Sequence, residues 1–93
     1  MRIPIQASTQ ARALATRLFH NKRKVNLKLQ VLDPVVLYVA PNQNDLQSGL
    51  GADGNPIRGL QLVQGVYDFL GFNGELWAIC SLQTEVEVQW WHV

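Results

Sequence analysis

Two segments of this chain alternate apolar and polar residues with a period of two. The first covers residues 24–31, KVNLKLQV, and the second covers residues 85–90, EVEVQW. Successive side chains of a β-strand point to opposite faces of the sheet, so each segment would place its aliphatic residues on one side. The chain must therefore fold around a sheet in which both segments hide their aliphatic faces.

The two alternating segments carry opposite charge. Residues 1–32 hold seven of the eight Lys and Arg residues and have a formal charge of +7, whereas residues 33–93 have a charge of +1 − 7 = −6. Opposite charges on neighbouring strands attract each other across the sheet. We expect Lys24 and Lys28 to pair with Glu85 and Glu87, either within the sheet or across a subunit boundary.

The composition favours a subunit of an assembly over a free monomer. The 93 residues form one domain, 47% of them are hydrophobic and only 16% are charged, against roughly 25% charged in a typical soluble domain. Apolar residues that one small core cannot hide are commonly covered by a partner subunit. We therefore expect a homo-oligomer.

Strand and turn signals follow each other regularly after residue 22. They predict strands over residues 23–32, 35–40, 60–63, 66–70, 75–80 and 84–91. The continuous apolar run 35–40 is typical of a strand covered on both faces, residues 71–74 (GFNG) are expected to form a turn, and residues 41–59 a long loop. The fold class is therefore all-β, a small β-sandwich or jelly-roll-like barrel of six to seven strands.

The N-terminal part of the chain fits two alternatives. We expect residues 1–13 to form an extended or short-helical arm and residues 14–93 to form the β-sandwich. The apolar residues between Ala11 and Phe19 fit an amphipathic helix capped by Ser8 or Thr9. The other reading is an extended arm that enters a strand at residues 14–19, and the sequence leaves both open.

Nothing in the chain predicts catalysis, a cofactor or a metal. Residues 49–54 (GLGADG) match the GxGxxG pattern, but no strand precedes them and Asn55-Pro56 follows where a helix should continue. His20 and His92 lack the neighbours of a metal or hydrolase site. Cys80 lies in an apolar run, where a free thiol behaves as a small buried hydrophobe. We expect a non-enzymatic protein. We also expect it to be made in the cytoplasm, since no apolar run is long enough for a membrane span or signal peptide.

The candidate interaction residues are basic or aromatic. The basic ones are Arg12, Arg17, Lys22, Arg23 and Lys24, which could contact an anionic surface. A nucleic-acid-binding module is the weaker alternative for them, because the total charge is only +1 and no aromatic residues are interleaved with these bases.

Trp90 and Trp91 are adjacent in a predicted strand, so they point to opposite faces and cannot both enter one core. If Trp90 faces inward with Val86 and Val88, Trp91 faces out as an interface anchor; the alternative is a frayed tail. Phe72, within GFNG, is either a second exposed apolar tip or packed against its own turn.

The order of these segments resembles small accessory virion proteins of tailed bacteriophages. The likeness is carried by residues 21–30 (NKRKVNLKLQ), 34–39 (PVVLYV), the glycine-rich loop, 74–78 (GELWA) and 86–88 (VEV). The resemblance implies a compact β-sandwich that binds the capsid as a decoration or cement protein. The alternative is a structural or receptor-tip protein of the neck, tail or fibre. The resemblance also implies a partner such as the major capsid protein, a location in the virion after synthesis in the host cytoplasm, and symmetric oligomers, among which we expect a trimer.

Overall fold

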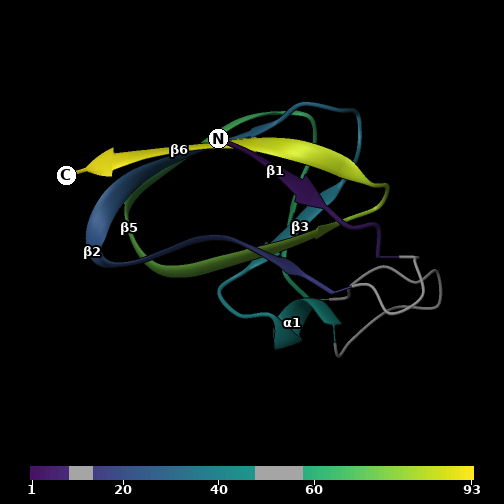
Figure 1. Cartoon of the computed structure of the whole chain (residues 1–93), viewed down its shortest axis with the longest axis horizontal. Coiled ribbons are helices and arrows are strands. Elements are labelled where there is room, and N and C mark those ends of the chain that lie inside the picture. Colours follow the sequence, from purple (N-terminus) through teal and green to yellow (C-terminus); the bar gives the residue numbers. More distant parts are fainter. Residues whose placement is uncertain (9–13, 48–57) are drawn as a thin grey trace.

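The computed structural model describes residues 1–8, 14–47 and 58–93, and these ranges are almost entirely β-strand. The elements are β1 (Arg2–Ile5), β2 (Thr16–Val31), β3 (Leu37–Ala40), α1 (Asn44–Gln47), β4 (Leu60–Leu62), β5 (Gly65–Cys80) and β6 (Thr84–His92) (Figure 1). The all-β prediction is confirmed.

The described strands form one antiparallel sheet that curls into a half-barrel. Their order is β1-β6-β2-β5-β3-β4, and the long strands β2 and β5 pair with each other from end to end. β6 pairs only with residues 25–31 of β2, whereas β3 pairs only with residues 77–80 of β5. The two long strands therefore run through both halves of the sheet and bend between them (Figure 1). The sandwich or jelly-roll assignment is not confirmed.

The bend depends on irregular pairing between β2 and β5. The register shifts between Asn21 and Val25 and again between Val25 and Leu27. On β5, Gly71 and Gly74 have φ angles of 63° and 100°, which glycine adopts readily and other residues rarely do. Bulges of this kind bend a strand and increase its twist. The predicted turn at residues 71–74 is wrong, because β5 continues through these residues as one strand.

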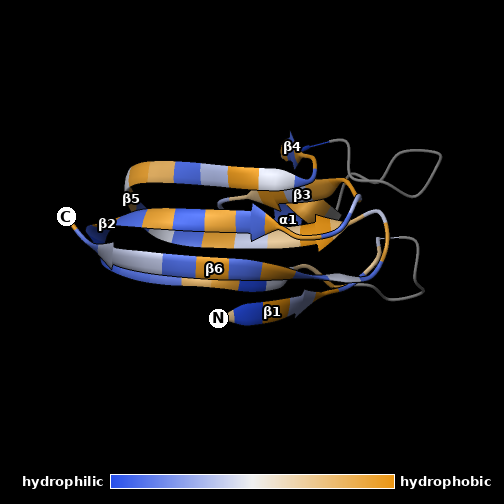
Figure 2. Ribbon diagram, turned by 90° about the horizontal axis from the view of Figure 1, so that it is seen from above, coloured by the Kyte–Doolittle hydropathy of each residue, from blue (hydrophilic) through white to orange (hydrophobic). Residues whose placement is uncertain are grey.

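The inner face of the curl holds the main core. Val25, Leu27, Leu29 and Val31 of β2 are all buried, and Val86 and Val88 of β6 join them. The polar residues between them face outward, and Figure 2 shows this alternation as orange and blue bands along β2 and β6. Both alternating segments are sheet members that hide their aliphatic faces, as the sequence predicted.

A second, smaller core lies on the other face of β3 and of the end of β5. It consists of Tyr38, Ala40, Ile79 and Leu46 with Ala15, so β3 is buried on both faces, as predicted for residues 35–40. Leu46 comes from α1, a single turn inside the predicted 41–59 loop. Asn42 accepts a hydrogen bond from the Asp45 backbone at 2.9 Å and so caps this turn. Residues 48–57 of the predicted loop lie outside the described residues.

The N-terminal arm is not confirmed. Residues 2–5 form β1 at one edge of the sheet, paired with β6. Ala7 then bridges to Cys80 in parallel fashion, so the N-terminal segment links the edge strand to the far end of β5. The strand alternative is right from Thr16 onward, where β2 begins, while residues 9–13, including Arg12, lie outside the described part of the chain.

Candidate interaction site

Most of the predicted interface residues meet at one end of the molecule, which we call the bend end (residues 19–26, 69–74 and 90–93). Val25 pairs with Phe72 on one side and with His92 on the other, so the bends of β2 and β5 lie beside the end of β6 (Figure 1). Lys22, Arg23 and Lys24 are exposed at this bend. The structure thus brings basic and aromatic residues together although they are far apart in the sequence.

Four aromatic side chains at the bend end contact one another, together with His92. The ring centroids of Phe19 lie 5.9 Å from Phe72 and 5.6 Å from Trp90, those of Phe69 and Phe72 are 6.2 Å apart, and those of Trp90 and His92 are 5.5 Å apart. We call this set the aromatic cluster. Phe72 lies within β5 and packs partly buried against the main core, so it is neither an exposed tip nor packed against a turn of its own.

The half-barrel is open beside the aromatic cluster. A hollow of about 370 Å³ lies there, lined among others by Met1, by Ile3 of β1, by Arg17, Phe19 and His20 of β2, and by Trp90 of β6. β6 does not pair with residues 16–20 of β2, so the Phe19–Trp90 contact crosses the opening between two strand segments that do not pair with each other. The sequence does not indicate that Phe19 and His20 belong to this site, because only the bend in β2 places them beside the end of β6.

The opposite face of the bend end carries a separate apolar patch. Trp91 is 47% exposed and Leu70 is 77% exposed. Asn26 lies between them, since it pairs with Trp91 and its side-chain oxygen accepts a hydrogen bond from Gly71 N at 3.2 Å. We call Asn26, Leu70 and Trp91 the outer patch. The two tryptophans face opposite sides, as predicted, although Trp90 is also 45% exposed.

Within the sheet, Lys24 and Lys28 do not pair with Glu85 and Glu87, so that form of the prediction is wrong, and pairing across a subunit boundary stays a prediction. The β2–β6 register places Lys28 opposite Gln89 and Glu87 opposite Gln30. Glu87 instead accepts a hydrogen bond from the N-terminal ammonium at 2.8 Å, and Arg2 lies 3.6 Å away. The hydrogen bond from the ammonium group, together with the charge of Arg2, lowers the pKa of Glu87 below its usual value.

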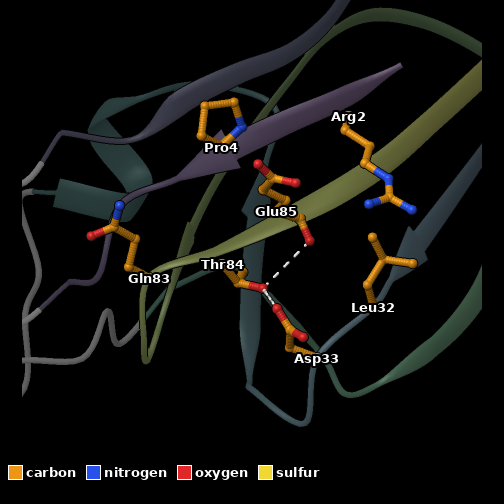
Figure 3. Close-up of a pocket in the computed structure, with 7 residues that line it drawn as sticks. All are labelled: Arg2, Pro4, Leu32, Asp33, Gln83, Thr84 and Glu85. Atoms are coloured by element: carbon orange, nitrogen blue, oxygen red, sulfur yellow. Dashed lines mark hydrogen bonds between the residues drawn. The ribbon is translucent and has the colours of Figure 1, made fainter.

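A second hollow lies at the end of the sheet away from the bend. Its volume is about 580 Å³, and its lining includes Arg2, Pro4, Asp33, Thr84 and Glu85. Figure 3 shows Asp33 and Thr84 facing each other, with the Thr84 hydroxyl donating a hydrogen bond to the Asp33 carboxylate. The hollow could accept a polar or cationic group, but its lining contains no histidine or cysteine.

Cys80 lies in the main core, and its side chain is fully buried. Burial raises the pKa of the thiol to about 11, because the thiolate would lose its hydration. The prediction of a buried cysteine in a strand is confirmed.

Residues 1–8, 14–47 and 58–93 contain neither a metal-binding cluster nor a membrane-spanning helix. Within these ranges no cluster of three or more His, Cys, Asp or Glu side chains could hold a metal ion. No helix there has the length and apolar character needed to cross a membrane. The GxGxxG match at residues 49–54 lies outside the described residues.

Comparison with protein-family models, with curated proteins and with solved structures gives no match.

Proposed function

We propose that this protein is a structural, non-enzymatic component of a tailed-bacteriophage virion, and that it decorates or cements the capsid by bridging shell subunits. Attachment to the neck, tail or fibre is the alternative location. The proposal includes a homo-oligomer, with a trimer favoured. It also includes a sandwich-like body, because the two halves of the curled sheet face each other across the main core.

The outer patch is the observation that carries this proposal. Trp91 and Leu70 are largely exposed, yet both lie on strands that are paired with β2. A tryptophan on a rigid strand can enter a partner's pocket with little loss of conformational entropy. A bridging protein needs such complementary surfaces and no chemistry.

The charges beside the outer patch favour an acidic partner surface. Lys22, Arg23 and Lys24 are exposed at the same bend, and none of them forms an ion pair with the described residues. Positive charge around an apolar contact speeds association with a negative surface and selects against positive ones.

The location is tested on particles of the phage that encodes this chain. Antibodies raised against the purified protein are used for immunogold electron microscopy of purified virions. Labelling spread over the shell supports capsid decoration, and labelling confined to the neck, tail or fibre supports the alternative. Virions that carry no label, with the unbound protein detected only in the lysate, contradict a virion role.

The outer patch is tested with Trp91→Ala and Leu70→Ser, using light scattering for the oligomeric state and co-sedimentation with shells from which the protein is absent. Each substitution is expected to weaken binding by about 2 kcal/mol, which is typical of a hot-spot residue. Val66→Ser is the matched control, since Val66 is also exposed on β5 but pairs with Gln30, away from the bend. Equal effects of all three substitutions would show that the outer patch is not the contact.

A further inference from the structure

We infer that the opening of the half-barrel beside Trp90 binds single-stranded nucleic acid. The nucleic-acid strand would lie along residues 17–24 of β2, on the side where β6 does not pair with them, with one base stacked on Trp90 and its phosphates near the basic residues of β2. Trp90 lies on the face opposite Trp91 of the outer patch, although both sites use Lys22, Arg23 and Lys24. The Trp90 and Trp91 variants therefore separate this activity from the proposed virion role.

Trp90 supplies a stacking surface. It is 45% exposed, it lines the hollow at the opening, and it is held from two sides by Phe19 at 5.6 Å and His92 at 5.5 Å between ring centroids. Proteins that bind single strands without sequence preference use such fixed, accessible aromatic rings, because every base has a stacking face.

Residues 16–24 of β2, which pair with β5 but not with β6, supply positive charge beside the same hollow. Arg17 and His20 line the hollow, and Lys22, Arg23 and Lys24 follow them along the strand. The one described carboxylate paired with these basic residues is Glu75, 3.5 Å from Arg17, so the four Lys and Arg residues leave a balance of 4 − 1 = +3. A straight strand from Arg17 to Lys24 would cover about 23 Å, and the bend of β2 after Asn21 brings these residues closer together than that. The basic residues can therefore contact a short single strand.

In the sequence, nucleic-acid binding is the weaker alternative, partly because no aromatic residues are interleaved with the basic residues. The fold removes that objection, since it brings Trp90 against Phe19, two residues from Arg17. Basic residues and an exposed ring in one groove are the combination that single-strand binding favours. An acidic peptide could satisfy the charges, but it would gain nothing from stacking on Trp90.

The experiment measures fluorescence anisotropy of labelled dT20 and U20 on titration with the full chain. We expect binding to weaken about 20- to 50-fold between 50 and 200 mM salt, as for three to four phosphate contacts on a single strand. Tryptophan fluorescence should be quenched on binding. A duplex of the same length should bind more weakly than dT20, because its bases are not free to stack.

Matched variants locate the site. Trp90→Ala should weaken dT20 binding about 5- to 150-fold, the range for loss of one stacked base, while Trp91→Ala on the opposite face should leave it unchanged. The triple variant Lys22→Gln, Arg23→Gln, Lys24→Gln should reduce the salt dependence of dT20 binding. Lys28→Gln is the control and should leave this salt dependence unchanged, because Lys28 is exposed on the part of β2 that pairs with both β5 and β6. The triple variant changes only exposed side chains, so it remains informative if Trp90→Ala destabilises the fold.

Three results would overturn the inference. The first is no binding of dT20 or U20 in 50 mM salt at protein concentrations above about 100 µM, the weak limit of non-specific binding. The second is equal loss of binding in the Trp90 and Trp91 variants. The third is displacement of dT20 by poly-glutamate at equal charge concentration, which would identify an acidic peptide as the occupant. None of these results bears on whether the protein is found in virions.

Discussion

At the scale of single residues, the face on which a side chain lies determines what it can do. Trp90 and Trp91 are adjacent and equally exposed, yet Trp90 contacts Phe19 across the opening whereas Trp91 lies over Asn26 on the outer face. Cys80 shows the other extreme, because its side chain is fully enclosed. Residue type alone would give the two tryptophans the same role and leave the reactivity of the thiol open.

We predict that Cys80 is inert in the folded protein. A pKa of about 11 in place of 9.0 lowers the thiolate fraction at pH 8 about 100-fold, and burial blocks the reagent as well. Ellman's reagent, followed at its usual absorbance, should react with Cys80 only after guanidinium is added. Fast labelling in buffer would mean that the end of β5 opens readily.

The same thiol makes stability depend on alkaline pH. Its folded-state pKa is raised, so the folded state favours the protonated thiol, and this contribution is complete below pH 9 and is lost as the pH rises toward 11. Urea unfolding at pH 8 and pH 10 should show lower stability at pH 10. In Cys80→Ala the part of this decrease that comes from the thiol should disappear.

At the scale of elements, β5 is one strand only because two glycines accept unusual backbone angles. Gly71 and Gly74 have positive φ, and a Cβ at either position would meet nothing within 4 Å. A substitution at these positions is therefore opposed by backbone strain and not by crowding. The bend of the whole sheet depends on these two residues and on the register shifts opposite them.

We predict that Gly74→Ala lowers the free energy of unfolding by about 2 kcal/mol and Gly71→Ala by about 1 kcal/mol. The difference arises from the two φ angles. Gly71 has a φ of 63°, within the left-handed region that other residues can reach, whereas Gly74 has a φ of 100°, outside that region. Urea unfolding measures both values. Gly71→Asn should be nearly neutral, since asparagine tolerates this region, and a large loss in that variant would contradict the argument.

The attachment of β1 is predicted to depend on acidic pH. The pKa of Glu87 is lowered by its hydrogen bond to the N-terminal ammonium and by Arg2, so its stabilising contribution is present above pH 4.5 and is lost as the pH falls through the lowered value. Amide exchange of β1, corrected for the intrinsic pH effect, should lose protection over that range. Glu87→Gln should remove the pH dependence, and Glu85→Gln, which changes a carboxylate on the same face, should retain it.

At the scale of the whole molecule, the two halves of the sheet cannot separate without breaking both long strands. β2 and β5 contribute to the core beneath β6 and to the core beneath β3. A chain of this size with one shared pair of strands should unfold in one step.

We predict that unfolding is a single transition at both ends of the molecule. Trp77 reports on the second core, and Trp90 and Trp91 report on the bend end. In the double variant Trp90→Phe, Trp91→Phe, the fluorescence of Trp77 should change at the same urea concentration as the circular dichroism. In Trp77→Phe, the fluorescence of Trp90 and Trp91 should likewise change together with the circular dichroism. Different midpoints within either variant would show that the halves unfold separately.

Local patterns predicted much of the fold. The alternation at residues 24–31 and 85–90 was enough to identify β2 and β6 and their buried faces, and the apolar run at 35–40 was enough to predict a strand buried on both sides. These predictions succeed because each depends on the periodicity of neighbouring side chains. They required no knowledge of which strands pair.

The sequence by itself thus determined the all-β class, the inward aliphatic faces and the opposite directions of Trp90 and Trp91. Only the tertiary structure decided that residues 71–74 continue a strand, that Glu87 pairs with Arg2 and the N-terminus, and that Phe19 meets Trp90. Those contacts depend on register and on where a strand bends. A shift of one residue in pairing changes every partner along a strand, and no local pattern in either strand specifies that shift.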